Sequence, residues 1–126
     1  MSISNENNPC VTVVELGAIT ADAEVPAAYF SKSRVITKVS VIDAAGIVAS
    51  DVNYAVLSLK NGSDVVASYD TRAAGQGALT ANVAGEAAIV AAQAAVAAGS
   101  TLTLDYNEEG TVAMTAAKLV IESYAK

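Results

Sequence analysis

The strongest constraint on the fold is an alternation of apolar and polar side chains that ends at an Asn-Gly pair. In the segment 52–60, Ala55, Leu57 and Leu59 fall on one face of an extended chain, and Asn61-Gly62 follows directly. Alternation with period two is typical of a half-buried β-strand. Asn-Gly is a strong hairpin signal because both residues adopt positive φ readily. The sequence therefore predicts a hairpin in which residues 64–70 return antiparallel to residues 52–60.

Three further segments, 34–42, 100–106 and 118–124, alternate in the same way and are predicted to be strands. The first of these is predicted to place one set of side chains on one face and a second set on the other. The first set is Val35, Val39 and Val41, and the second is Ile36, Lys38, Ser40 and Ile42.

Two segments lack this alternation. Residues 17–30 are predicted to form an irregular connection, because Gly17 and Pro26 interrupt it. Residues 84–99 are Ala-rich, and propensity alone favours a helix there. Because few of their side chains are bulkier than Ala, we predict instead a strand at 86–91 and then a tight connection of about one turn. Four residues of the first segment are expected to pack onto the core: Ile19, Val25, Tyr29 and Phe30.

Seven or eight short strands separated by turn residues predict an all-β fold, an antiparallel two-sheet β-sandwich of jelly-roll type. The 126 residues suffice for one such domain. The first nine residues are polar and Asn-rich, and the run 11–16 can pair with a sheet of this chain or of a neighbour. We therefore expect an extended N-terminal arm at 1–16 and a β-sandwich domain at 17–126.

The composition argues against most enzyme classes. The chain has no His, which removes imidazole nucleophile systems and imidazole metal sites, and its single Cys10 cannot form an intrachain disulfide. A formal charge of −6 opposes binding to nucleic acid. No apolar stretch is long enough to cross a membrane, and the first residues do not resemble a secretion signal. We expect no enzymatic activity, no catalytic or metal-binding residues, no cofactor, and no nucleic-acid or membrane partner.

The segment 105–110, Asp-Tyr-Asn-Glu-Glu-Gly, partly matches the start of a calcium-binding loop. The match ends at position 116, where the closing acid is replaced by Ala116. Glu108 and Glu109 are adjacent, so they cannot face each other across a sugar as a glycosidase pair must. An acidic hairpin turn is the simpler interpretation.

Interface formation is the role that the residues favour. With 27 Ala and 17 Val, the core gains little burial energy per residue, so assembly with other subunits is expected to add stability. Three cations lie within seven residues and form either a docking patch for an acidic partner or protection for a strand edge. The predicted interface residues are Val11, Val13, Val14 and Leu16 of the arm and Lys32, Arg34 and Lys38 of the basic patch.

Three features of the segment 19–124 resemble small jelly-roll proteins of tailed-bacteriophage virions. They are Ala-Ser-Asp-x-Asn-Tyr at 49–54, the Asn-Gly hairpin at 61–62 and Ala-Ala-Gly-Ser-Thr-Leu-Thr-Leu at 97–104. The resemblance implies a capsid decoration, or cement, protein on the outer surface of the head. It also implies a homotrimer that binds the major capsid protein and joins its subunits. Similar strings occur in head-fibre and tail modules, so a fibre or baseplate module that binds host glycan is the alternative. Tyr29, Tyr54, Tyr69, Tyr106 and Tyr124 are its candidate platforms.

Overall fold

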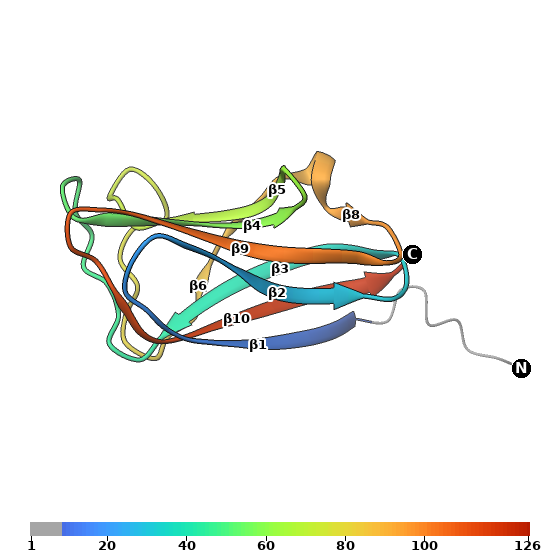
Figure 1. Ribbon diagram of the computed structural model, residues 1–126, viewed down its shortest axis with the longest axis horizontal. Coiled ribbons are helices and arrows are strands. Elements are labelled where there is room, and N and C mark those ends of the chain that lie inside the picture. The colour runs from blue at the N-terminus through green and yellow to red at the C-terminus, as the bar shows by residue number, and fades with distance from the viewer. Residues whose placement is uncertain (1–8) are drawn as a thin grey trace, which may run out of the picture.

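The computed structural model describes residues 9–126 and is a β-sandwich of two antiparallel sheets (Figure 1), which confirms the predicted all-β, two-sheet sandwich. No helix among these residues has the length and apolarity to span a membrane. The elements are the strands β1 (Pro9–Ile19), β2 (Ala23–Phe30), β3 (Arg34–Asp43), β4 (Tyr54–Asn61), β5 (Asp64–Asp70), β6 (Gly85–Glu86) and β7 (Ala88–Ile89), the 3-10 turn η1 (Ala91–Gln93), and the strands β8 (Ala95–Val96), β9 (Ser100–Glu109) and β10 (Met114–Ala125).

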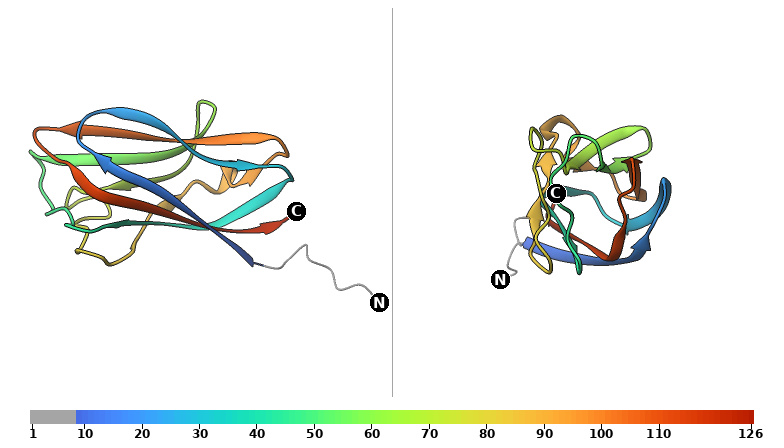
Figure 2. Two further views of the ribbon diagram at one scale, coloured as in Figure 1. Left: turned by 60° about the horizontal axis from the view of Figure 1, so that its bottom comes forward. Right: turned by 90° about the vertical axis from the view of Figure 1, so that its left-hand side faces the viewer.

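The first half of the chain pairs with the second half in reverse order. β1 pairs with β10, β2 with β9, β3 with β6 and β8, and β4 with β5. These pairs alternate between the two layers, giving one sheet in the order β1-β10-β3-β6 and another in the order β2-β9-β4-β5-β7. β1 and β2 are the edge strands on one side of the sandwich, and the views in Figure 2 show them joined by a turn.

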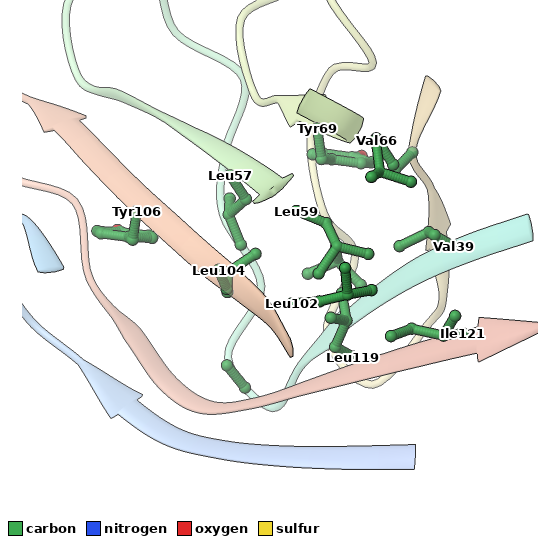
Figure 3. Packing of buried hydrophobic residues seen from close by; sticks show 14 of the residues in the cluster. Val39, Leu57, Leu59, Val66, Tyr69, Leu102, Leu104, Tyr106, Leu119 and Ile121 are labelled. Carbon is green, nitrogen blue, oxygen red and sulfur yellow. The ribbon is translucent and has the colours of Figure 1, made fainter. Parts of the chain in front are cut away.

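The core lies between the two sheets and is built from the inward-facing residues of the long strands (Figure 3). Leu, Ile and Val dominate it, and it also contains two tyrosines, a phenylalanine and a methionine. The largest fully buried side chains are Tyr106, Ile36, Leu57, Leu59, Leu102, Leu104, Met114, Leu119, Ile121, Val39, Val41 and Val66. Small buried residues such as Ala55, Ala67 and Ala117 lie among these large side chains.

The β4–β5 hairpin confirms the prediction from alternation. Ala55, Leu57 and Leu59 are all buried, and Asn61 pairs with Asp64 across the turn. The turn itself differs from the prediction, because Asn61 does not have a positive φ. The central residues are Gly62 and Ser63, with a φ of 64° at Gly62. A glycine with positive φ at the first central position is the pattern of a type II′ turn, which also suits the twist of a hairpin.

The strand β3 confirms the predicted position but not the predicted faces. Ile36 lies opposite Ser123 and Lys38 lies opposite Glu122, which is the neighbouring residue of β10. Thr37, between Ile36 and Lys38, has no partner and forms a bulge. The extra residue reverses the alternation, so that Ile36 joins Val39 and Val41 in the core. The expectation that Val35 shares their buried face was therefore wrong.

The two segments without alternation contain more strand than predicted. Residues 9–19 and 23–30 form β1 and β2, with only a short turn between them, so the predicted irregular connection at 17–30 was wrong. Ile19 and Phe30 are buried as expected, whereas Tyr29 is 63% exposed. The predicted strand at 86–91 is divided between β6 and β7, which belong to different sheets, and η1 supplies the expected single turn.

Asp43 fixes the loop after β3 to the start of β10. Its side chain is fully buried, and its carboxylate accepts hydrogen bonds from the backbone N–H groups of Gly46 at 3.0 Å, Thr115 at 2.9 Å and Ala116 at 3.1 Å. Buried polar groups are stable only when such bonds are made. The role of Asp43 is thus to hold two loops in place.

Replacing Asp43 with Ala is expected to lower the free energy of unfolding by about 3 kcal/mol, because three backbone donors lose their acceptor. Chemical denaturation measures the change. Glu109→Ala, at an exposed position on β9, is the control and is expected to change the stability by less than about 0.5 kcal/mol. Equal stability of Asp43→Ala and the parent protein would contradict this role.

Tyr106 is expected to make the protein sensitive to alkali. Its side chain is fully buried, and its hydroxyl donates a hydrogen bond to the carbonyl of Val112 at 3.0 Å. Burial, together with the charges of Glu108, Asp43 and Asp22, raises the pKa of Tyr106 to about 12. The unfolded chain releases this proton near pH 10, so the stabilisation is complete below pH 10 and is lost between about pH 10 and pH 12.

We therefore expect the stability advantage of the parent protein over Tyr106→Phe to shrink as the pH rises above 10. At neutral pH the variant is expected to be less stable by about 1 kcal/mol, because the hydrogen bond to Val112 is lost. Denaturation at a series of pH values from 8 to 12 gives both quantities. A constant difference across this range would contradict the assignment.

Candidate interface surfaces

The outer edge of β1 is the longest regular strand edge without a partner strand among residues 9–126. Pairing with β10 is continuous from Pro9 to Glu15, and a register shift follows at Gly17, whose φ is 69°. Residues 9–16 of the predicted arm are therefore part of the sandwich sheet, and β1 continues through the predicted domain boundary at 16 and 17. Residues 1–8 of the arm lie outside the described residues.

The backbone hydrogen bonds of the sheet show which groups of β1 point toward this edge. The carbonyls of Val39 and Asp43 accept bonds from Ala87 and Asn82, so both face away from β10. Backbone N–H and C=O groups of successive residues point alternately to the two sides of a strand. The residues of β10 that do not bond to β3 are therefore Leu119 and Ile121. These two bond to β1, where their partners are Val14 and Thr12. The N–H and C=O groups of the intervening residues, Val11, Val13 and Glu15, therefore point outward along the free edge.

The predicted arm residues divide between the two faces of the sheet. Val14 and Leu16 are half-buried and pack against the core. Val11 and Val13 lie on the outer face and are 58% and 54% exposed. Val120 of β10 is opposite Val13, so three valines form an apolar group beside the free edge. Glu15 pairs with Lys118 at 3.2 Å at one end of this group, and Glu122 lies beside Lys38 at the other.

The other edges are less suited to pairing with a strand. β2, the edge strand of the second sheet, contains Pro26 and a register shift between Pro26 and Ala28. Proline and bulges are common devices that prevent edge-to-edge association. On the far side of the sandwich, the edge strands β6, β7 and β8 have only two residues each. Apart from Pro9 at its first position, the edge of β1 as far as Glu15 carries no Pro, no bulge and no Lys.

The predicted basic patch lies at the end of the sandwich that contains the β2–β3 turn. Lys32 and Lys38 are exposed, while Arg34 is half-buried, donates from its Nε to the Ser123 hydroxyl at 2.7 Å and lies 6.0 Å from the Phe30 ring. Lys126, which the sequence did not indicate, joins them because its N–H donates to the Ser33 carbonyl at 3.1 Å. We call these four cations the cationic end.

The remaining cations are neutralised. Lys60 pairs with Asp105 at 3.8 Å, Arg72 with Asp70, and Lys118 with Glu15. Within residues 9–126, no salt bridge involves a member of the cationic end. The opposite end is acidic: Asp22 in the β1–β2 turn accepts a hydrogen bond from the Glu108 N–H at 2.7 Å, and Asp51 and Glu109 are exposed. The two tips of the sandwich therefore differ in charge, with the C-terminus marking the cationic end in Figure 1.

A shallow hollow of about 490 Å³ lies beside Tyr54, Asp70 and Arg72 at the acidic end. The Arg72 guanidinium lies 4.4 Å from the centre of the Tyr54 ring and donates to both carboxylate oxygens of Asp70. These hydrogen bonds hold the pKa of Asp70 below its usual value. One face of Tyr54 is therefore occupied. Of the five tyrosines considered as glycan platforms, Tyr69 and Tyr106 are buried, Tyr124 is half-buried, and Tyr29 is the most exposed.

The acidic segment 105–110 is mostly strand and not a turn. Residues 105–109 continue β9, so the predicted hairpin turn was misplaced and begins only at Gly110. Asp105 pairs with Lys60, and the Glu108 carboxylate accepts the Val112 N–H at 3.2 Å. Among residues 9–126, no three Asp, Glu or Cys side chains are grouped closely enough to hold a metal ion.

Comparison with known proteins found no matching family model, no similar curated protein and no similar solved structure.

Deleting residues 1–16 is expected to destabilise or unfold the sandwich, because the deletion removes most of β1 and uncovers one side of β10. The loss of Val14 and Leu16 from the core adds to the effect. Deleting residues 1–8 leaves every described pair of β1 in place and is the matched control. Circular dichroism and thermal unfolding distinguish the two variants. A cooperative, fully stable sandwich without residues 1–16 would show that β1 is dispensable.

Proposed function

We propose that the protein is a capsid decoration protein of a tailed bacteriophage, which binds the outer surface of the head and stabilises contacts between major capsid subunits. The observation that carries this proposal is the nested strand order. Pairing β1 with β10, β2 with β9, β3 with β6 and β8, and β4 with β5 across two sheets is the arrangement expected of a jelly roll. This arrangement supports the resemblance to small jelly-roll proteins of phage virions.

The sequence strings behind that resemblance fall on structural features. Residues 49–54 lead into β4, residues 61–62 begin the β4–β5 turn, and residues 97–104 form the turn into β9 and its first half. Asn53 accepts the Thr111 N–H at 3.0 Å and so ties the loop before β4 to the β9–β10 turn. These strings therefore support a common scaffold, and the attachment to a shell is inferred from the surface.

The cationic end is the surface that we propose faces the capsid. The protein carries a formal charge of −6, so it is repelled by an acidic partner except where positive charge is concentrated. Lys32, Lys38 and Lys126 supply this charge without an acidic side chain paired to them by a salt bridge in residues 9–126. Orientation by opposite charge mainly raises the association rate and fixes the docking geometry. The acidic end then points away from the DNA-filled shell.

The test is co-sedimentation with heads of the phage that encodes the chain, prepared without the bound protein. We expect the parent protein to sediment with the heads, and Lys32→Glu combined with Lys126→Glu to weaken binding by at least about tenfold, with a strong dependence of parent binding on salt. Arg72→Gln, which removes a cation at the opposite end, is the control and is expected to bind normally. Binding that is unaffected by the double substitution would refute the proposed docking surface. Absence of the parent protein from the heads would refute the function.

A further inference from the structure

We propose that β1 pairs antiparallel with β1 of a second copy of this chain, across a two-fold axis close to Thr12. The regular part of the edge, Pro9 to Glu15, is centred on Thr12. In this arrangement Val11 of each copy lies opposite Val13 of the other. The two sheets then become one continuous sheet, in which β1 is no longer an edge strand.

The backbone groups of β1 are placed correctly for this pairing. The N–H and C=O groups of Val11 and Val13 point outward. This direction follows, through the strand registers, from the hydrogen bonds that the carbonyls of Val39 and Asp43 accept. Two opposing residues exchange two hydrogen bonds when the backbone N–H and C=O groups of each point toward the other strand. The two Val11–Val13 pairs therefore give four backbone hydrogen bonds, and Thr12 occupies the intervening position without such bonds.

The side chains beside the edge fit a second copy better than an unrelated strand. The exposed Val11 and Val13 and their neighbour Val120 come together with the same three residues of the second copy, so apolar side chains meet apolar side chains. The charged residues stay at the two ends of this apolar group. Glu15 forms a salt bridge with Lys118 at 3.2 Å, and in this register it lies opposite Pro9 of the second copy. No like charges of the two copies are therefore paired across the edge.

The geometry also requires an isologous dimer. An edge that pairs with itself generates a two-fold axis and closes after two copies. β2 is not an equivalent partner, because Pro26 lacks an N–H and a register shift follows it. This association differs from the homotrimer that the resemblance implies. Because the paired strands run antiparallel, the cationic ends of the two copies point in opposite directions, so one cationic end of each dimer can face a given surface.

Val13→Pro is the most selective disruption, because it removes an outward N–H and leaves the bonds between β1 and β10 in place. We expect the parent protein to have the mass of a dimer in sedimentation-velocity and light-scattering measurements. Val13→Pro is expected to weaken the dimer by at least about tenfold. Val11→Lys with Val13→Lys should have the same effect without changing backbone groups. Val48→Lys, at a loop residue that is 82% exposed, is the control and should remain dimeric.

Cross-linking tests the register. In a Cys10→Ser background, Thr12→Cys places the two sulfurs on opposing, non-hydrogen-bonded residues, and mild oxidation is expected to yield a covalent dimer in high yield. Val48→Cys in the same background should not. The proposal is overturned by a monomeric or trimeric parent protein, or by a dimer that survives both the Val13→Pro and the double lysine variants. It is also overturned by equal cross-linking of the two cysteine variants. Since no capsid is needed, these results are independent of the proposed head binding.

Discussion

The pairing of β10 with β1 on one side and β3 on the other is the interaction on which the rest of the structure depends. It places the last strand of the chain, which has twelve residues, between two strands from the first part of the chain. All other pairs lie nested inside this one, so it encloses the long intervening chain in a single closed arrangement. Such contacts carry a large entropic cost of loop closure before they gain any burial energy. Asp43 contributes at this point, because its carboxylate joins the end of β3 to the start of β10.

The parts of the fold that were predictable are those in which one side chain in two is large and apolar. β4, with Ala55, Leu57 and Leu59, and β10, with Leu119 and Ile121, both show this pattern, and both lie inside a sheet with a buried inner face. Edge strands are harder to predict, because their apolar residues are fewer and smaller. β2 contributes Ala23, Val25 and Ala28 to the core margin and was mistaken for an irregular segment.

Two errors have a more specific physical origin. Thr37 forms a bulge on β3, and one added residue exchanges the two faces of a strand. No local pattern in the segment 34–42 marks that position, because it depends on how β3 meets Glu122 and Ser123. The segment 84–99 is rich in Ala, which fits helix, strand and turn alike, so its path between the two sheets is decided by the pairing partners of β6, β7 and β8. The predicted basic patch lacked Lys126 for a related reason, because only the folded chain brings Lys126 beside the other three cations.

The contrast between the two edge strands on one side of the sandwich bears on what the molecule does. β2 has the features that keep an edge from pairing, whereas β1, directly beside it, has a regular stretch with outward valines. An exposed edge of this kind favours association with other strands unless it has a specific partner. The valines also explain why the sequence suggested an arm, because a run of β-branched residues favours pairing with a neighbouring strand. Only the strand register shows which of these valines remain available to a second chain. Val14 and Leu16 stabilise the sandwich, so Val11 and Val13 are the residues of this group that can serve a neighbour without loss of the fold.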